Sequence, residues 1–175
     1  MLKPMLVVLW MMVLVPRTAQ ACSVTTSPEF VVDRSAMWTA PPSPGVLNAR
    51  LYLVRFGSGS CADIQLANLD VSGMPARKLR HFGYLIRPLS GFNGGGPLPD
   101  THPLAPMVWG DTANLTWMGG DIVPDADGHL RWRLEVTPVS RSGTRGTPFE
   151  VCAATDGSCP ALLPCGKTCP APSSP

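Results

Sequence analysis

The stretch Leu130-Arg-Trp-Arg-Leu-Glu-Val-Thr-Pro-Val139 decides the fold class of this chain. Its apolar set is Leu130, Trp132, Leu134 and Val136, and the residues between them are Arg131, Arg133, Glu135 and Thr137. Alternate side chains of a β-strand point to opposite faces, so a period of two with polar partners predicts a strand with one buried and one wet face. After the Ser- and Gly-containing loop 140–146, residues 149–153 are expected to return as its hairpin partner.

Several other short segments carry the same kind of pattern. We expect strands at 29–38, 47–56, 62–71, 81–88 and 114–118, separated by Gly- and Pro-rich turns and by a long loop at 89–106. No apolar set keeps the helical period over three turns. Seven or so short strands in about 130 residues predict an all-β fold, a sandwich of two sheets.

The N-terminal residues have the features of an exported protein. Residues 5–15 are an apolar run of 11 residues, and Ala19-Gln-Ala21 is a small-x-small cleavage pattern, so 1–21 is expected to be a signal peptide. A bilayer-spanning helix needs roughly 20 apolar residues, so no membrane span is expected. Removal of 1–21 would leave 154 of the 175 residues, beginning at Cys22. Residues 22–154 then form the β-sandwich domain.

Charge balance narrows the class of partner. Lys3 and Arg17 belong to the expected signal peptide, so the remainder has 12 basic and 12 acidic residues. Nucleic acids and anionic membranes select for a basic excess, so neither is expected as a partner. We expect a secreted, periplasmic or cell-envelope location. Lipid anchoring through Cys22 is the less favoured alternative, because Ala19 and Gln20 fit a lipobox poorly.

Cysteines point to disulfide bonds in this compartment. The six cysteines are Cys22, Cys61, Cys152, Cys159, Cys165 and Cys169. An even number in an exported chain predicts three disulfides, and zinc thiolate ligation is disfavoured there. The spacing does not choose among the possible pairings. We expect Cys22 and Cys61 each to pair with a C-terminal cysteine and the remaining two to pair locally, so that the Cys- and Pro-rich tail 155–175 is stapled covalently.

Two stretches resemble bacterial immunoglobulin-like and fibronectin-III-like secreted domains. Pro44-Gly-Val-Leu-Asn-Ala-Arg-Leu-Tyr-Leu53 is similar to the entry into an early strand of such domains. The 130–136 strand, its Ser-Gly turn and Pro148-Phe-Glu-Val151 resemble their last hairpin. The resemblance covers 27–153 and implies an extracytoplasmic binding or structural module without catalytic residues. The chain lacks the usual tryptophan of an early-middle strand.

The acidic segment 121–128 has two interpretations. Asp121, Asp125 and Asp127 precede Gly128 and form a weak calcium candidate, because carboxylates before a glycine can chelate a hard cation. The EF-hand spacing fails, since its twelfth position would be Leu134. We favour a turn, because Asp and Gly accept the backbone geometry of a tight connection.

Enzymatic chemistry finds little support. Trp109-Gly-Asp-Thr-Ala-Asn114 with 125–128 is similar to copper–zinc superoxide dismutases, but those need a His-x-His pair, and here the histidines are isolated at 81, 102 and 129. There is no Gly-x-Ser-x-Gly elbow. Glu135 and Glu150 are expected to form a charge ladder beside arginines rather than an acid–base pair.

Function therefore has to rest on exposed side chains. Trp117 is expected in the core, whereas Trp109 lies in a Gly- and Pro-rich region and is a possible contact residue. Asn114-Leu-Thr116 is an N-glycosylation sequon, meaningful in a eukaryotic host. We expect a non-enzymatic binding or structural module without a cofactor, whose partner is an unidentified protein or glycan. The alternatives are a degenerate metal enzyme and a small secreted inhibitor acting through its tail.

Overall fold

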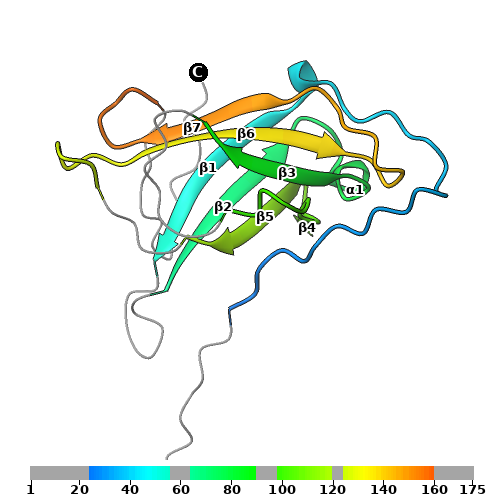
Figure 1. The fold of residues 1–175 in the computed structure, drawn as a ribbon, viewed down its shortest axis with the longest axis horizontal. Helices are drawn as coiled ribbons and strands as arrows, with labels where there is room; N and C mark the ends of the chain where they lie inside the picture. The colour runs from blue at the N-terminus through cyan, green and yellow to red at the C-terminus, as the bar shows by residue number, and fades with distance from the viewer. Residues whose placement is uncertain (1–23, 56–63, 90–97, 120–123, 160–175) are drawn as a thin grey trace, which may run out of the picture.

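The computed structural model is built mainly from β-strands, and it describes residues 24–55, 64–89, 98–119 and 124–159 (Figure 1). The strands are β1 (Asn48–Arg55), β2 (Gln65–Ser72), β3 (Gly83–Pro88), β4 (Met107–Trp109), β5 (Thr112–Met118), β6 (Arg131–Val139) and β7 (Phe149–Ala154). A single turn of α-helix, α1 (Ala76–Leu79), connects β2 to β3, and the 3-10 turn Pro44–Val46 precedes β1.

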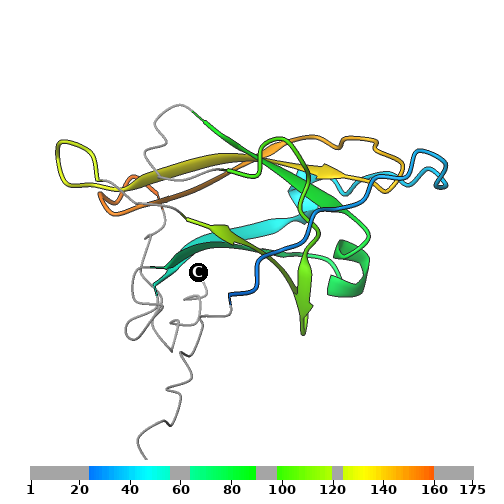
Figure 2. The ribbon, with the colours of Figure 1, turned by 60° about the horizontal axis from the view of Figure 1, so that its bottom comes forward.

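The strands form two antiparallel sheets. One sheet has the order β1-β2-β5-β4 and the other has the order β3-β6-β7. Figure 2 shows them as two layers. The expected all-β class with two sheets is therefore confirmed for the described residues.

One hydrophobic core lies between the sheets and follows the alternation read from the sequence. Leu69 and Leu115 of the four-stranded sheet and Trp132, Leu134 and Val136 of the three-stranded sheet are fully buried in the same cluster. Trp117, at 5% exposure, is also part of it. The residues between these positions point away from the core, because strand side chains alternate.

Most expected strands are present with boundaries shifted by at most three residues, but one expectation is wrong. Residues 29–38 form no strand; they run in an extended path ending in a turn, in which the backbone N–H and side-chain hydroxyl of Ser35 donate to Asp33 Oδ1. Strand β4 and helix α1 were not expected, because three and four residues are too few to show a period.

The segment 24–33, here called the crossing segment, lies along both sheets instead of joining one. Its backbone hydrogen bonds include Ser27 N to Thr116 O (2.7 Å), Phe30 N to Pro103 O (2.7 Å) and Asp33 N to Arg141 O (2.8 Å). These acceptors belong to β5, to the approach to β4 and to the β6–β7 turn. A β-strand needs successive bonds to one neighbour, and here the partner changes every few residues.

Gly83 positions the crossing segment. The Phe30 side chain packs against Gly83 so closely that a Cβ there would lie 2.4 Å from Phe30 Cγ. Phe30 is thereby 9% exposed, although the next residue, Val31, is 71% exposed. The absence of a side chain at position 83 thus allows an aromatic anchor to hold the crossing segment against β3.

Candidate functional site

The outward side of the four-stranded sheet carries a cluster of polar side chains. Register places them in two rows across three strands: Tyr52, Asn68 and Thr116 in one, and Arg50, Asp70 and Asn114 in the next. All six alternate with core residues of their strands, so they share the face opposite the core. We call this set the polar face.

A depression of about 380 Å³ is open on the polar face. Asn68 and Thr116 are buried beside it, whereas Tyr52, Asp70 and Asn114 are half-buried. Trp109, which pairs with Thr112 through strand β4, lines the same depression and is 71% exposed. A pocket of this size is within the range of about 300–1,000 Å³ that small-molecule sites occupy.

Asp70 is the centre of a hydrogen-bond network in this depression. Asn114 Nδ2 donates to Asp70 Oδ1 over 2.8 Å, and the Tyr52 hydroxyl lies 3.4 Å from the same oxygen. Asp70 Oδ2 accepts no hydrogen bond from the part of the chain that the structure describes. The network therefore fixes the carboxylate while leaving one of its oxygens available as an acceptor.

Thr116 leaves a second acceptor available. Its hydroxyl lies 2.7 Å from Asn68 Oδ1 and 2.5 Å from Asn114 Oδ1. A hydroxyl has one proton to donate. The Thr116 hydroxyl can therefore donate to only one of the two amide oxygens, Asn68 Oδ1 or Asn114 Oδ1. The other amide oxygen can accept a hydrogen bond from a group that enters the depression.

Tyr52 is held as a neutral phenol. Burial, followed by the negative charge of Asp70 and the hydrogen bond to it, raises the pKa of Tyr52 to about 12. The Arg50 guanidinium lies 5.7 Å from the Tyr52 ring centroid, within the range of a cation–π contact. Tyr52 is thus a hydroxyl donor at all physiological pH values.

Among the sequence candidates for contact, the structure brings only Trp109 to this depression. The sequence alone does not distinguish Tyr52, Asn68 and Asp70 as site residues, because each is an ordinary polar residue at an outward strand position. Their convergence depends on the pairing of β1, β2 and β5, which alternation within a single strand does not specify. The signal for this site that the sequence does contain is the set of polar residues at the outward positions of the expected strands.

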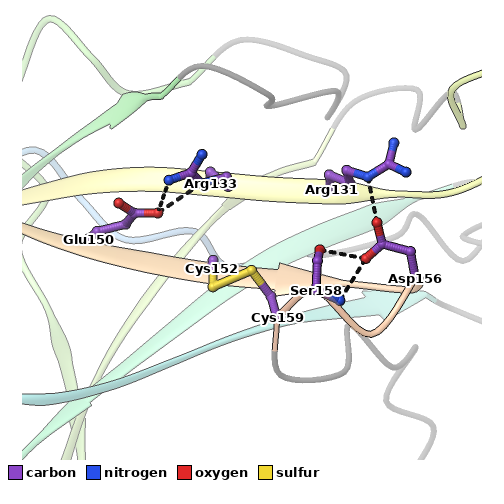
Figure 3. The surroundings of a disulfide bond; sticks show 7 residues. All are labelled: Arg131, Arg133, Glu150, Cys152, Asp156, Ser158 and Cys159. Carbon is purple, nitrogen blue, oxygen red and sulfur yellow. Dashed lines mark hydrogen bonds and ion pairs between the residues drawn. A yellow bond between two sulfur atoms is a disulfide. The ribbon is translucent and has the colours of Figure 1, made fainter.

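The cysteines expected to form disulfides are described only in part. Cys152 and Cys159 are bonded to each other, which agrees with the local pair expected near the C-terminus (Figure 3). Cys22, Cys61, Cys165 and Cys169 lie outside the described residues, as do the expected signal peptide 1–21, Asp121 and most of the tail 155–175.

The expected charge ladder on the β6–β7 hairpin is present. Glu135 and Glu150 are directly paired in register, and Arg133 Nη2 lies 2.7 Å from Glu150 Oε1. Arg131 Nε lies 2.6 Å from Asp156 Oδ2 beside the disulfide (Figure 3). Hydrogen bonds from Ser158, followed by the one from Arg131, hold the pKa of Asp156 below its usual value.

Asp125 closes the turn that was the favoured interpretation of 121–128. Its Oδ1 accepts from the backbone N–H groups of Asp127 (3.0 Å) and His129 (2.9 Å), and its other oxygen contacts the Arg131 guanidinium. Gly128 has φ +79°, which a glycine adopts without strain. The Asp125 carboxylate is thus occupied by protein donors.

The three histidines are in different environments. His102 Nδ1 lies 3.2 Å from Glu29 Oε1 at the exposed crossing segment, His81 follows α1, and His129 belongs to the β5–β6 turn. Within residues 24–55, 64–89, 98–119 and 124–159, no three His, Cys, Asp or Glu side chains gather as a metal site.

Comparisons with protein-family models, with curated proteins and with solved structures found no match for this chain. None of the helices in the described ranges has the length and apolar character needed to cross a membrane.

Proposed function

We propose that this chain is a secreted, non-enzymatic binding module with an immunoglobulin-like sandwich fold, and that its polar face binds a neutral glycan. The strand order supports the fold proposal. Constant-type immunoglobulin domains pair strands A-B-E-D in one sheet and C-F-G in the other. The order β1-β2-β5-β4 and β3-β6-β7 corresponds to this arrangement when the strands are lettered along the chain.

Two observations support export. Residues 1–21 have the composition of a signal peptide. The Cys152–Cys159 bond is of a kind that persists in extracellular and periplasmic compartments and is rare in the cytosol.

Exposure of Trp109 beside the Asp70 network carries the glycan proposal. A sugar ring presents an apolar C–H face and a rim of hydroxyl groups. An exposed indole offers a flat apolar surface for the first, and fixed carboxylate and amide groups match the second. Trp109, Asp70 and Asn114 combine these groups around one depression.

The polar character of the depression favours a glycan over a protein partner. Protein interfaces are usually centred on a well-packed apolar cluster. Here the aromatic lining residues are Trp109 and Tyr52, and the other lining side chains that the structure describes are Asp, Asn and Thr. Asp70 is the one charged side chain among the described residues that line the depression, and its carboxylate does not favour an anionic sugar.

The experiment is a titration of the full chain with cellohexaose, xylohexaose and chitohexaose. Isothermal titration calorimetry measures the affinity, and the indole N–H signals in NMR spectra report which tryptophan is affected. We expect at least one of the three to bind and to shift the Trp109 indole signal. Trp109→Ala should weaken that binding at least about tenfold, which corresponds to about 1.4 kcal/mol of lost stacking.

Trp38 provides the matched control, because it is 66% exposed and lies outside the depression. Trp38→Ala should leave the affinity within about twofold, while Asp70→Ala and Asn114→Ala should weaken it. Failure of all three oligosaccharides to bind, or binding that survives Trp109→Ala, would overturn the glycan proposal.

A further inference from the structure

A second, larger cavity of about 660 Å³ lies away from the polar face. Four segments that are distant in sequence form it: the crossing segment and its continuation to Thr39, the connection from Met74 to Phe82 that contains α1, Ala105 before β4, and Arg141 of the β6–β7 turn. These segments gather at one end of the sandwich, opposite the β5–β6 turn (Figures 1 and 2).

The interior of this cavity is apolar. Phe30 and Phe82 are buried, and Met74 packs against the core. Met37 lines the same cavity and is 87% exposed, and Val31 is 71% exposed. Apolar side chains that line a hollow and remain exposed are typical of a ligand site rather than of a completed core.

The polar residues that line the cavity are mainly basic. Lys78, Arg80, His81 and Arg141 line the cavity, and no aspartate or glutamate of the described residues does. Arg141 interacts with Asp33 outside the cavity. For Lys78 and Arg80, by contrast, the described residues provide no ion pair. Two uncompensated positive charges beside an apolar hollow complement a ligand that is apolar along its length and negatively charged at one end.

We propose that this cavity binds a free single-chain amphipathic carboxylate, such as a medium-chain fatty acid anion. The alkyl chain lies among Phe30, Met74 and Phe82, and the carboxylate lies at Lys78 and Arg80. The site is separate from the polar face, because the two cavities share no lining residue within the described parts of the chain.

Calorimetric titration with octanoate, decanoate and dodecanoate, each below its critical micelle concentration, tests the apolar part. Each added methylene that enters the cavity should tighten binding about fourfold, since burying one CH₂ contributes about 0.8 kcal/mol. Dodecanol and dodecyltrimethylammonium should bind more weakly than dodecanoate, because neither carries the negative charge.

Charge reversal tests the cationic part. Lys78→Glu with Arg80→Glu should weaken dodecanoate binding at least tenfold while leaving dodecanol binding unchanged. Arg77→Glu is the matched control: Arg77 is an exposed neighbour in the same helix, but it does not line the cavity. It should change affinity less than twofold. Ala36→Trp should fill the cavity and reduce binding of every chain length.

Several outcomes would overturn this proposal. One is the absence of dodecanoate binding; another is equal weakening by Arg77→Glu and by the Lys78 and Arg80 changes, which would indicate a long-range charge effect. Sedimentation with phosphatidylglycerol vesicles but no binding of free dodecanoate would show that this end contacts a membrane surface instead. Trp109→Ala should not affect dodecanoate, so failure here and failure of the glycan proposal are distinguishable.

Discussion

Replacing Gly83 by alanine is expected to displace the Phe30 side chain and loosen the crossing segment. A Cβ at position 83 would lie 2.4 Å from Phe30 Cγ, 2.5 Å from Cδ1 and 2.6 Å from Cβ. Carbon atoms in contact are about 3.5–4.0 Å apart, so the ring and the new methyl cannot both stay in place. Gly83 is not among the glycines with positive φ, so its backbone accepts alanine without strain.

The size of the effect follows from the burial of Phe30. This side chain is 9% exposed, and burying a phenylalanine contributes about 1.5–3 kcal/mol to folding. Because the crossing segment can move away while both sheets keep their own hydrogen bonds, the loss should not exceed this value. We therefore expect Gly83→Ala to lower the free energy of unfolding by about 1.5–3 kcal/mol.

A double-mutant cycle isolates the contact. Phe30→Gly removes both the ring and the Cβ, so adding Gly83→Ala in that background should cost less than about 0.5 kcal/mol, and the cycle should give a coupling energy of about 1–2.5 kcal/mol. Phe30→Ala retains the Cβ that lies 2.6 Å from the new methyl, so its cycle should give a smaller coupling.

Urea unfolding of the disulfide-intact chain, monitored by tryptophan fluorescence and circular dichroism, measures each term. Gly45→Ala is the control, because a Cβ there meets no atom within 4 Å. Additive effects of Phe30→Gly and Gly83→Ala, or a Gly83→Ala variant as stable as wild type, would refute this account of the crossing segment. Since Phe30 also lines the apolar cavity, Gly83→Ala should weaken dodecanoate binding as well.

Three further predictions concern single groups. The fully buried Tyr84 hydroxyl has no hydrogen-bond partner among the described residues. Tyr84→Phe should therefore leave the free energy of unfolding in urea unchanged or raise it by about 1 kcal/mol. A decrease of that size would show that the hydroxyl does make a hydrogen bond. Because the folded state raises the pKa of Tyr52, the neutral phenol stabilises the fold fully below pH 10, and this stabilisation is lost as the pH rises toward about 12. Wild type should therefore lose more stability than Tyr52→Phe over that interval in urea unfolding, and equal losses would contradict this. Replacing Cys152 and Cys159 together by alanine should lower the free energy of unfolding by about 2.5 kcal/mol, because the bond restricts the unfolded chain by closing a loop between cysteines 7 residues apart. An unchanged urea unfolding midpoint would argue against that contribution.

Strands with one solvent-exposed face were predictable from the sequence, because the alternation of apolar and polar residues that identifies each of them lies within that strand. In β6, Trp132 and Leu134 alternate with Arg131 and Arg133, and the structure buries the first pair while leaving the second partly exposed. Such a pattern depends on residues within one strand and needs no knowledge of its neighbours.

Sites were less predictable because they depend on pairing between strands. Tyr52, Asp70 and Asn114 come from three strands, and a shift of register by one residue would direct each of them into the core. The apolar cavity is still less visible in the sequence, since Phe30, Phe82 and Arg141 lie on segments joined only by the fold.

The incorrect strand prediction at 29–38 has the same physical origin as the cavity. Phe30, Val31 and Val32 have the β-branched and aromatic composition of a strand, yet composition does not reveal where backbone hydrogen bonds go. Here they go to Pro103 and Arg141, on separate parts of the fold. A strand pairing with one neighbour would have covered its apolar side chains against a sheet. The crossing segment instead changes hydrogen-bond partners, so it buries Phe30 but leaves Val31 exposed at the cavity. The same irregular backbone path that made the strand prediction wrong therefore supplies the apolar side chains of the proposed ligand site.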